Sequence, residues 1–205
     1  AKEYLNLEDL VNSEKIYLNI LEIEPENYEA LMGMGNIKIK NKEFLNSIKY
    51  YKKSIYIYKN SIDAYINLSN IYIIIKDYKE AINILQLGRK IDKKNYILIN
   101  NLAFAYFNIN KLKNSESIVK QGLENDSKNF FLYNLKGNIN IRNNNFDLAI
   151  KCFQKSLQIK KDFWPAYENL ISTLEKTNNI KEFQSYLTNA KNYFSDDYRF
   201  NYYLA

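Results

Sequence analysis

Two side chains that often carry catalysis, histidine and cysteine, are nearly missing from this sequence. Histidine is absent, which excludes the commonest general base, the nucleophile–histidine triads and most transition-metal sites. The single cysteine, Cys152, cannot build a disulfide framework or a cysteine-based zinc site, and we interpret it as a buried or half-buried thiol. The adjacent carboxylates Asp196 and Asp197 fall in a stretch typical of a solvated turn. We therefore predict no enzyme activity, no catalytic residue, no metal and no cofactor.

Asparagine recurs at spacings that suit a different chemistry, namely hydrogen bonding. Two sets of three asparagines are each spaced at multiples of 34 residues: Asn67, Asn101 and Asn169, and Asn36, Asn70 and Asn138. A carboxamide both donates and accepts hydrogen bonds. A ladder of carboxamides can therefore pair with the backbone of an extended peptide, whatever its sequence. The other interpretation, which applies mainly to the second set, is that these side chains tie adjacent helices together.

The asparagine spacing belongs to a repeat that covers the chain of 205 residues. Five consecutive blocks of 34 residues, without insertion or deletion, span residues 28–61, 62–95, 96–129, 130–163 and 164–197. Residues 1–27 match positions 8 to 34 of an earlier block, and residues 198–205 match positions 1 to 8 of a later one. A fixed period of this length is the signature of stacked repeats. We expect one solenoid domain over residues 1–205, in which each block contacts only its neighbours.

Each block contains two segments with helical periodicity. Positions 4, 7, 8 and 11 share one face of the first segment, and positions 17, 20, 21, 24 and 28 share one face of the second. Positions 8, 20 and 27 are mostly small, which allows two helices to approach closely. Short polar breaks such as Lys76-Asp77 and Asn110-Lys111 separate the segments. The pattern predicts an all-α fold of helix–turn–helix repeats.

This pattern resembles the tetratricopeptide repeat, whose motif is the set of small and large residues at positions 8, 17, 20, 24 and 27. The resemblance covers the whole chain. In two blocks the chain departs from it, because Lys38 and Asn140 replace the usual aromatic residue at position 11 and Lys136 replaces the usual aliphatic residue at position 7. The resemblance implies an α-solenoid, a right-handed superhelix with the first helices on a concave groove and the second helices on a convex face.

The family's groove binds proteins or peptides, so the resemblance implies an interaction or scaffold module. Positions 2, 5, 6, 9, 12 and 13 face away from the packing positions and should line the groove. We expect them to present both asparagine sets together with five apolar side chains and one cation: Ile66, Ile73, Phe104, Phe107, Ile141 and Arg142. Apolar surface of this kind favours a partner with apolar side chains, either a strand-like peptide or an amphipathic helix.

The formal net charge is +6, which raises the alternative of a nucleic-acid or acidic-ligand binder. Outward positions of the second segments hold four acids and ten lysines: Lys49, Lys52, Lys53, Lys79, Lys90, Lys113, Lys120, Lys151, Lys155 and Lys181. A solvated convex face that keeps the protein soluble explains this excess. Single-strand binders also use aromatic stacking platforms, which this face lacks. We therefore argue against a nucleic-acid partner.

The ends and the hydropathy of the chain give further expectations. No apolar run approaches the roughly 20 residues that span a bilayer, and no signal peptide opens the chain, so we expect a cytoplasmic protein without a membrane span. The chain lacks an initiator Met and begins and ends inside blocks, which suggests a fragment. It could then be a regulatory segment of a larger enzyme. Residues 198–204 form an aromatic-rich half unit, and such uncapped ends predict self-association.

Overall fold

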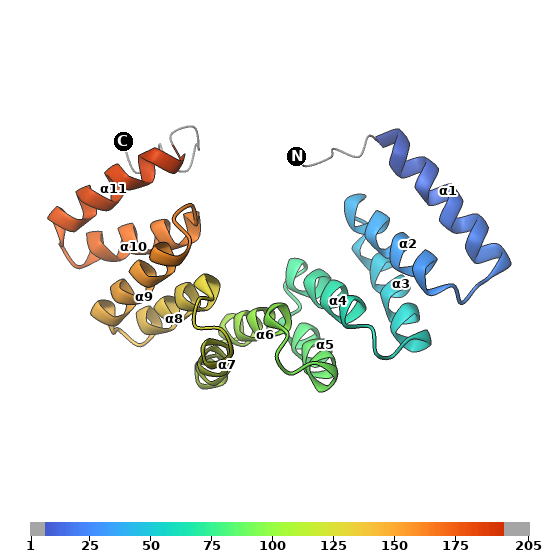
Figure 1. Cartoon of the computed structure of the whole chain (residues 1–205), viewed down its shortest axis with the longest axis horizontal. Coiled ribbons are helices and arrows are strands. Elements are labelled where there is room, and N and C mark those ends of the chain that lie inside the picture. Colours follow the sequence, from blue (N-terminus) through green and yellow to red (C-terminus); the bar gives the residue numbers. More distant parts are fainter. Residues whose placement is uncertain (1–6, 195–205) are drawn as a thin grey trace. The chain divides into compact units, whose positions relative to one another are not determined.

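The computed structural model describes residues 7–194, and the regular structure of these residues consists of eleven α-helices (Figure 1). In chain order the helices are α1 (Leu7–Ile23), α2 (Tyr28–Lys40), α3 (Phe44–Ile57), α4 (Ile62–Ile74), α5 (Tyr78–Ile91), α6 (Tyr96–Asn108), α7 (Leu112–Asn125), α8 (Phe130–Arg142), α9 (Phe146–Ile159), α10 (Trp164–Lys176) and α11 (Ile180–Phe194). The half unit at residues 198–205 lies outside the described residues. The predicted all-α fold of stacked helix–turn–helix repeats is confirmed.

A polar residue at the last position of a block starts most of the first helices. The Asn27 side chain accepts a hydrogen bond from the backbone N–H of Ala30 at 3.0 Å, and Ser61 accepts one from Ala64 at 3.2 Å. Asn95 and Asn129 cap α6 and α8 in the same way. Because the first backbone N–H groups of a helix have no partner within it, these caps determine where each first helix begins. Helix α10 lacks a side-chain cap and has a proline in its first turn instead.

A residue in the left-handed region ends each first helix, always at position 15 of its block. The positive φ angles are 61° at Lys42, 62° at Lys76, 59° at Asn110, 59° at Asn144 and 56° at Asn178. The next backbone N–H then turns back to the helix, as when Glu43 N donates to the Lys38 carbonyl at 2.8 Å. This bond satisfies a carbonyl that the ending helix leaves open. The chain reverses within a few residues and the second helix can pack against the first.

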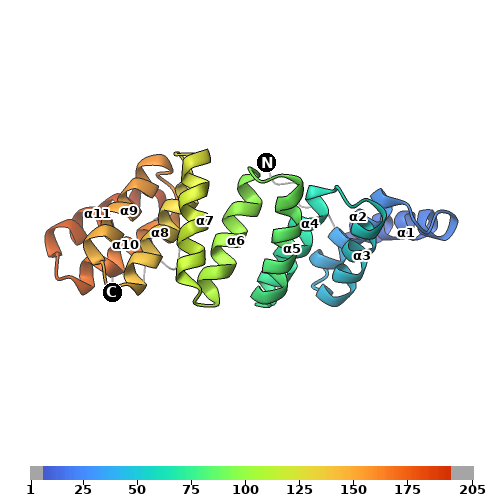
Figure 2. The ribbon, with the colours of Figure 1, turned by 90° about the horizontal axis from the view of Figure 1, so that it is seen from below.

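The chain divides into two compact units, Ala1–Ile109 with α1 to α6 and Asn110–Ala205 with α7 to α11. Within each unit consecutive helices lie side by side (Figures 1 and 2). Two pairs of first helices from successive blocks also contact each other, namely α4 with α6 and α8 with α10. This second set of contacts brings the predicted asparagine positions of neighbouring blocks together.

Close packing inside a block depends on small residues opposite large ones. The Ser47 hydroxyl is fully buried and donates to the Gly35 carbonyl at 2.7 Å. A Cβ placed on Gly35 would lie 2.7 Å from the Tyr51 ring, and one on Gly137 would lie 2.3 Å from the Phe153 ring. Both distances are too short for non-bonded carbon atoms. In these two blocks the aromatic ring at position 24 therefore occupies the space that a side chain at position 8 would need.

Candidate functional site

The first asparagine pair of the Ala1–Ile109 unit joins α2 and α4. Asn67 Nδ2 donates to Asn36 Oδ1 at 3.5 Å. The same oxygen accepts a hydrogen bond from the Tyr51 hydroxyl of α3 at 2.6 Å. Tyr51 reaches Asn36 because its ring passes over Gly35, which has no Cβ to block it. Burial raises the pKa of the Tyr51 phenol to about 12, so the hydroxyl remains a donor at neutral pH.

The second pair repeats this arrangement between α4 and α6. Asn101 Nδ2 donates to Asn70 Oδ1 at 2.7 Å. In both pairs the donor stands at position 6 of its block and the acceptor at position 9 of the preceding block, 31 residues earlier. Asn36 is exposed and the other three side chains are half-buried. The two pairs therefore lie at the surface of the first helices and are not sealed in the core.

The Asn110–Ala205 unit forms a different pair. Asn169 Nδ2 of α10 donates to Asn134 Oδ1 of α8 at 3.0 Å, 35 residues earlier. Asn134 stands at position 5 and is buried, with 7% of its surface exposed. Asn138, at the position that accepts in the other unit, is half-buried and makes no side-chain hydrogen bond to another described residue. In this unit the periodic spacing of the asparagines does not by itself predict which two amides form a hydrogen bond.

The amides in the Ala1–Ile109 unit keep hydrogen-bonding capacity after pairing. Each position-6 side chain uses its NH₂ group in its pair, so its oxygen is left over. Each position-9 side chain uses only its oxygen there, so its NH₂ group is left over. A pair thus fixes the orientation of two carboxamides and still presents donors and acceptors to a further group.

The predicted apolar side chains divide into two groups. Ile73, Phe104, Phe107 and Ile141 are half-buried, and Arg142 is exposed. Ile66 differs from the expectation of an accessible side chain, because only 8% of its surface is exposed and it belongs to the core. Contact between α4 and α6 covers that flank of the first helix, where position 5 lies. We correct Ile66 to a packing residue.

Two residues with a role at this surface were missed in the sequence. The repeat pattern places Tyr51 at position 24, on the packing face of its segment, and the two asparagine sets do not include Asn134. The signal for Tyr51 is Gly35, 16 residues earlier, because a ring can cross a first helix only where no Cβ stands. The signal for Asn134 is a second amide four residues before Asn138, which offers Asn169 a choice of acceptor.

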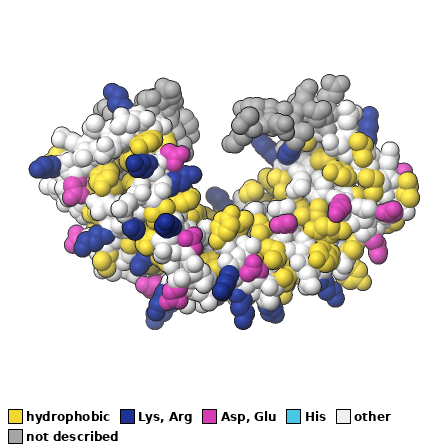
Figure 3. Space-filling view, viewed as in Figure 1, with side chains coloured by type: hydrophobic (Ala, Val, Ile, Leu, Met, Phe, Trp, Pro, Cys, Tyr) yellow, Lys and Arg dark blue, Asp and Glu magenta, His cyan; other side chains and the backbone are white. Residues whose placement is uncertain are grey.

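The surface charges follow the sequence pattern. All ten outward lysines of the second helices are exposed. On the face that Figure 3 draws, basic, acidic and hydrophobic side chains are interspersed. Lys52 lies over the Tyr72 ring, with Nζ 5.9 Å from the centroid. Interspersed charge of both signs is typical of a solvated surface, and the nucleic-acid alternative gains no support.

Of the groups singled out in the sequence for possible catalysis, Cys152 is described by the structure, whereas Asp196 and Asp197 lie outside the described residues. Cys152 is half-buried, and burial raises the pKa of its thiol, so the thiolate is disfavoured. No group of three or more acidic, cysteine or histidine side chains suited to a metal ion occurs among the described residues. Within residues 7–194 no helix has both the length and the apolar character needed to cross a membrane.

The repeats and the fold of this chain are similar to those of known proteins. The family model described as Tetratricopeptide repeat matches residues 28–61, 62–95 and 132–163. A comparison with curated protein sequences finds no match. Among solved structures, MamA is similar at 20% identity with a TM-score of 0.69, covering 85% of this chain and 96% of that chain. YrrB, described as a TPR protein with an unusual peptide-binding site, is similar at 16% identity and a TM-score of 0.63, with coverages of 91% and 96%.

A third solved structure is a tetratricopeptide repeat protein from Parabacteroides merdae ATCC 43184. It shares 14% identity with this chain at a TM-score of 0.80, and the match covers 93% of this chain and 76% of that chain. At these identities the likeness to solved structures concerns the fold. The fold and the matched repeats agree with the helix–turn–helix pattern read from the sequence.

Proposed function

Because this chain belongs to the tetratricopeptide repeat family, we propose that it binds an extended segment of a partner protein along α2, α4 and α6. The observation that carries the proposal is the set of two oriented asparagine pairs, Asn36–Asn67 and Asn70–Asn101. Both pairs lie within the Ala1–Ile109 unit. They belong to three first helices that follow one another in the repeat.

The pairs suit a peptide backbone because a backbone presents a donor and an acceptor at every residue. An extended segment can donate to Oδ1 of Asn67 or Asn101 and accept from Nδ2 of Asn36 or Asn70. Tyr51 and the partner amide hold Asn36 in place before binding. A side chain that is already ordered loses less conformational entropy when the peptide docks. This preorganisation favours binding that is independent of the peptide's sequence.

Selectivity would come from the apolar side chains beside the pairs. Ile73 and Phe104 are half-buried and lie on α4 and α6. Apolar slots of this kind favour a segment with large apolar side chains at alternate positions, since an extended chain directs alternate side chains to one face. The described peptide-binding site of YrrB supports a peptide as the occupant, at the level of the shared fold.

The test removes two of the amides and leaves the helices intact. Peptides are selected from a displayed random library on the natural chain, and their affinity is then measured for the variant Asn67→Ala with Asn101→Ala. We expect binding to weaken by roughly 1–3 kcal/mol, because hydrogen bonds to the peptide backbone are lost. Helical circular dichroism and the melting temperature check that the variant is folded.

The matched control changes two asparagines on second helices. Asn46 of α3 and Asn83 of α5 are exposed and bond only to glutamates of their own helix ends. The variant Asn46→Ala with Asn83→Ala should bind the selected peptides with unchanged affinity. Equal affinity of the natural chain and the Asn67/Asn101 variant would contradict the proposal. Steep weakening with salt would instead point to the exposed lysines.

A further inference from the structure

The seam between one block and the next has a regular composition in three places. The second helix contributes position 21, and the following first helix contributes positions 7 and 11. These seams are wholly apolar between α3 and α4, α5 and α6, and α9 and α10: Ile48, Leu68 and Tyr72; Ile82, Leu102 and Tyr106; Ile150, Leu170 and Leu174. At position 7 the three leucines are at most 1% exposed. Each apolar seam is filled by its own side chains.

The seam between α7 and α8 breaks this rule at all three positions. It has Glu116 at position 21, Lys136 at position 7 and Asn140 at position 11. Lys136 is exposed where the other seams bury a leucine. A cavity of about 360 Å³ opens between the two helices, within the Asn110–Ala205 unit. The departure from the repeat pattern at Lys136 thus coincides with unfilled space.

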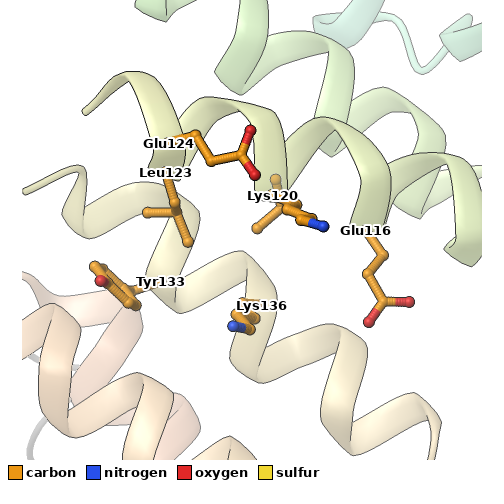
Figure 4. Close-up of a pocket in the computed structure, with 7 residues that line it drawn as sticks. Glu116, Lys120, Leu123, Glu124, Tyr133 and Lys136 are labelled. Carbon is orange, nitrogen blue, oxygen red and sulfur yellow. The ribbon is translucent and has the colours of Figure 1, made fainter. Parts of the chain in front are cut away.

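The cavity has an apolar floor and a rim with both charges. The floor is formed by Val119, Leu123 and Tyr133. The rim consists of two acids and two bases: Glu116, Glu124, Lys120 and Lys136. All four rim residues are exposed, and none forms an ion pair with another described residue. Figure 4 shows the α7 side chains on one side of the cavity and Tyr133 and Lys136 of α8 on the other.

The seam between α1 and α2 shows what the same charges do when they are paired. Glu14 stands at position 21 and Lys38 at position 11, and their charged atoms are 2.6 Å apart. Lys38 also contacts Glu43 at 3.1 Å, and the hydrogen bond to Glu14 raises the pKa of Lys38. Those charges satisfy each other within the fold. At the α7–α8 seam the base stands at position 7 instead, and neither Glu116 nor Lys136 forms an ion pair with a described residue.

We infer that the α7–α8 cavity binds a small apolar zwitterion, an α-amino acid with an aliphatic or aromatic side chain. The volume lies at the lower end of the range for small-molecule pockets. The floor takes the apolar side chain, a rim glutamate takes the ammonium group, and a rim lysine takes the carboxylate.

The experiment is a titration of the ¹⁵N-labelled natural chain with L-leucine and L-phenylalanine, followed by NMR. Saturable shifts are expected for the backbone amides of Val119, Leu123 and Tyr133. The single-charge analogues 4-methylpentanoate and 3-methylbutylamine should bind at least about tenfold more weakly, because each lacks one charge-assisted hydrogen bond. Shifts of equal size and midpoint for these analogues would overturn the assignment of a zwitterion.

A filled-seam variant provides the structural control. Glu116→Ile with Lys136→Leu places the residues of the α5–α6 seam at positions 21 and 7, so the variant should fold and should lose the saturable shifts. The matched variant Asp147→Ile with Lys151→Leu makes the same change on the exposed face of α9 and should keep them. Absence of saturable shifts in the natural chain, or their persistence in the filled-seam variant, would overturn the proposal. Peptide binding at the asparagine pairs should be the same in all three proteins.

Discussion

In the Ala1–Ile109 unit the asparagines at position 6 bond to position 9 of the preceding block, whereas in the Asn110–Ala205 unit Asn169 bonds to Asn134 at position 5. The difference comes from the alternatives that each position-6 amide meets. Position 5 of the preceding block is Met32 for Asn67 and Ile66 for Asn101, and neither side chain offers an amide. In the second unit Asn134 offers an amide oxygen, which accepts the hydrogen bond from Asn169. A repeated side chain therefore does not guarantee a repeated hydrogen bond.

The two units also treat their glycine–aromatic pairs differently. Tyr51 lies over Gly35 and Phe153 lies over Gly137, and both rings are fully buried. Only Tyr51 has a hydroxyl, and it donates to Asn36. Phe153 cannot orient Asn138 in this way. The same contact between a glycine and an aromatic ring thus orients an amide pair in the first unit and contributes only packing in the second.

The largest expected effect concerns the steric part of this comparison. Gly137→Ala should lower the free energy of unfolding by about 1–3 kcal/mol, because the new Cβ would lie 2.3 Å from the Phe153 ring. Phe153→Leu alone should also destabilise, by leaving a cavity. The double variant Gly137→Ala with Phe153→Leu should lose less than the sum, since it approaches the Ser69–Leu85 combination. Denaturant unfolding measures all three, and strictly additive losses would contradict the pairing of the two positions.

The next effect tests the choice of hydrogen-bond acceptor. Asn134→Ile places in the second unit the residue that the α4 block has at position 5. We expect Asn169 to turn to Asn138 and restore the 31-residue spacing, at a cost in stability of about 1 kcal/mol or less. A crystal structure of the variant, or the side-chain amide signals of Asn138 and Asn169, would show the exchange. If Asn138 keeps its side chain unpaired, competition at position 5 is not the cause.

The smallest effect concerns the turn at position 15, where the units use different residues. The first unit has Lys42 and Lys76 in the left-handed region, and the second has Asn110, Asn144 and Asn178. Asparagine tolerates this conformation better than lysine does. Lys76→Asn should raise the free energy of unfolding by about 0.5 kcal/mol, and Asn144→Lys should lower it by a similar amount. Thermal melts of the two variants check this, and shifts of the same sign would contradict it.

Most of the fold could be predicted from the sequence because its causes are local. The period places a capping side chain such as Asn27 before a first helix and a turn-compatible residue such as Asn144 after it. Caps, turn conformations and helical periodicity act over a few residues, so they can be read along the chain. The exposure of Asn36 and the half-burial of Asn67 follow from the same periodicity.

The candidate site could be predicted less completely, because its contacts join different helices. The burial of Ile66 depends on a neighbouring first helix and was not expected. The role of Tyr51 depends on what lies above Gly35, across the turn. The cavity beside Lys136 depends on how much of a seam its neighbours fill. Each of these features depends on distances between helices, and such distances cannot be read along the sequence.

The sequence by itself determined the repeat, the helices and the positions at which carboxamides reach the surface, since each follows from spacing and local backbone preference. The tertiary structure alone decided that Asn169 bonds to Asn134, that Tyr51 holds Asn36, and that the charges around the α7–α8 cavity form no ion pair with another described residue. The physical reason is that an amide, a hydroxyl or a charge takes the partner that lies nearest in space. Which partner is nearest depends on the packing of neighbouring helices.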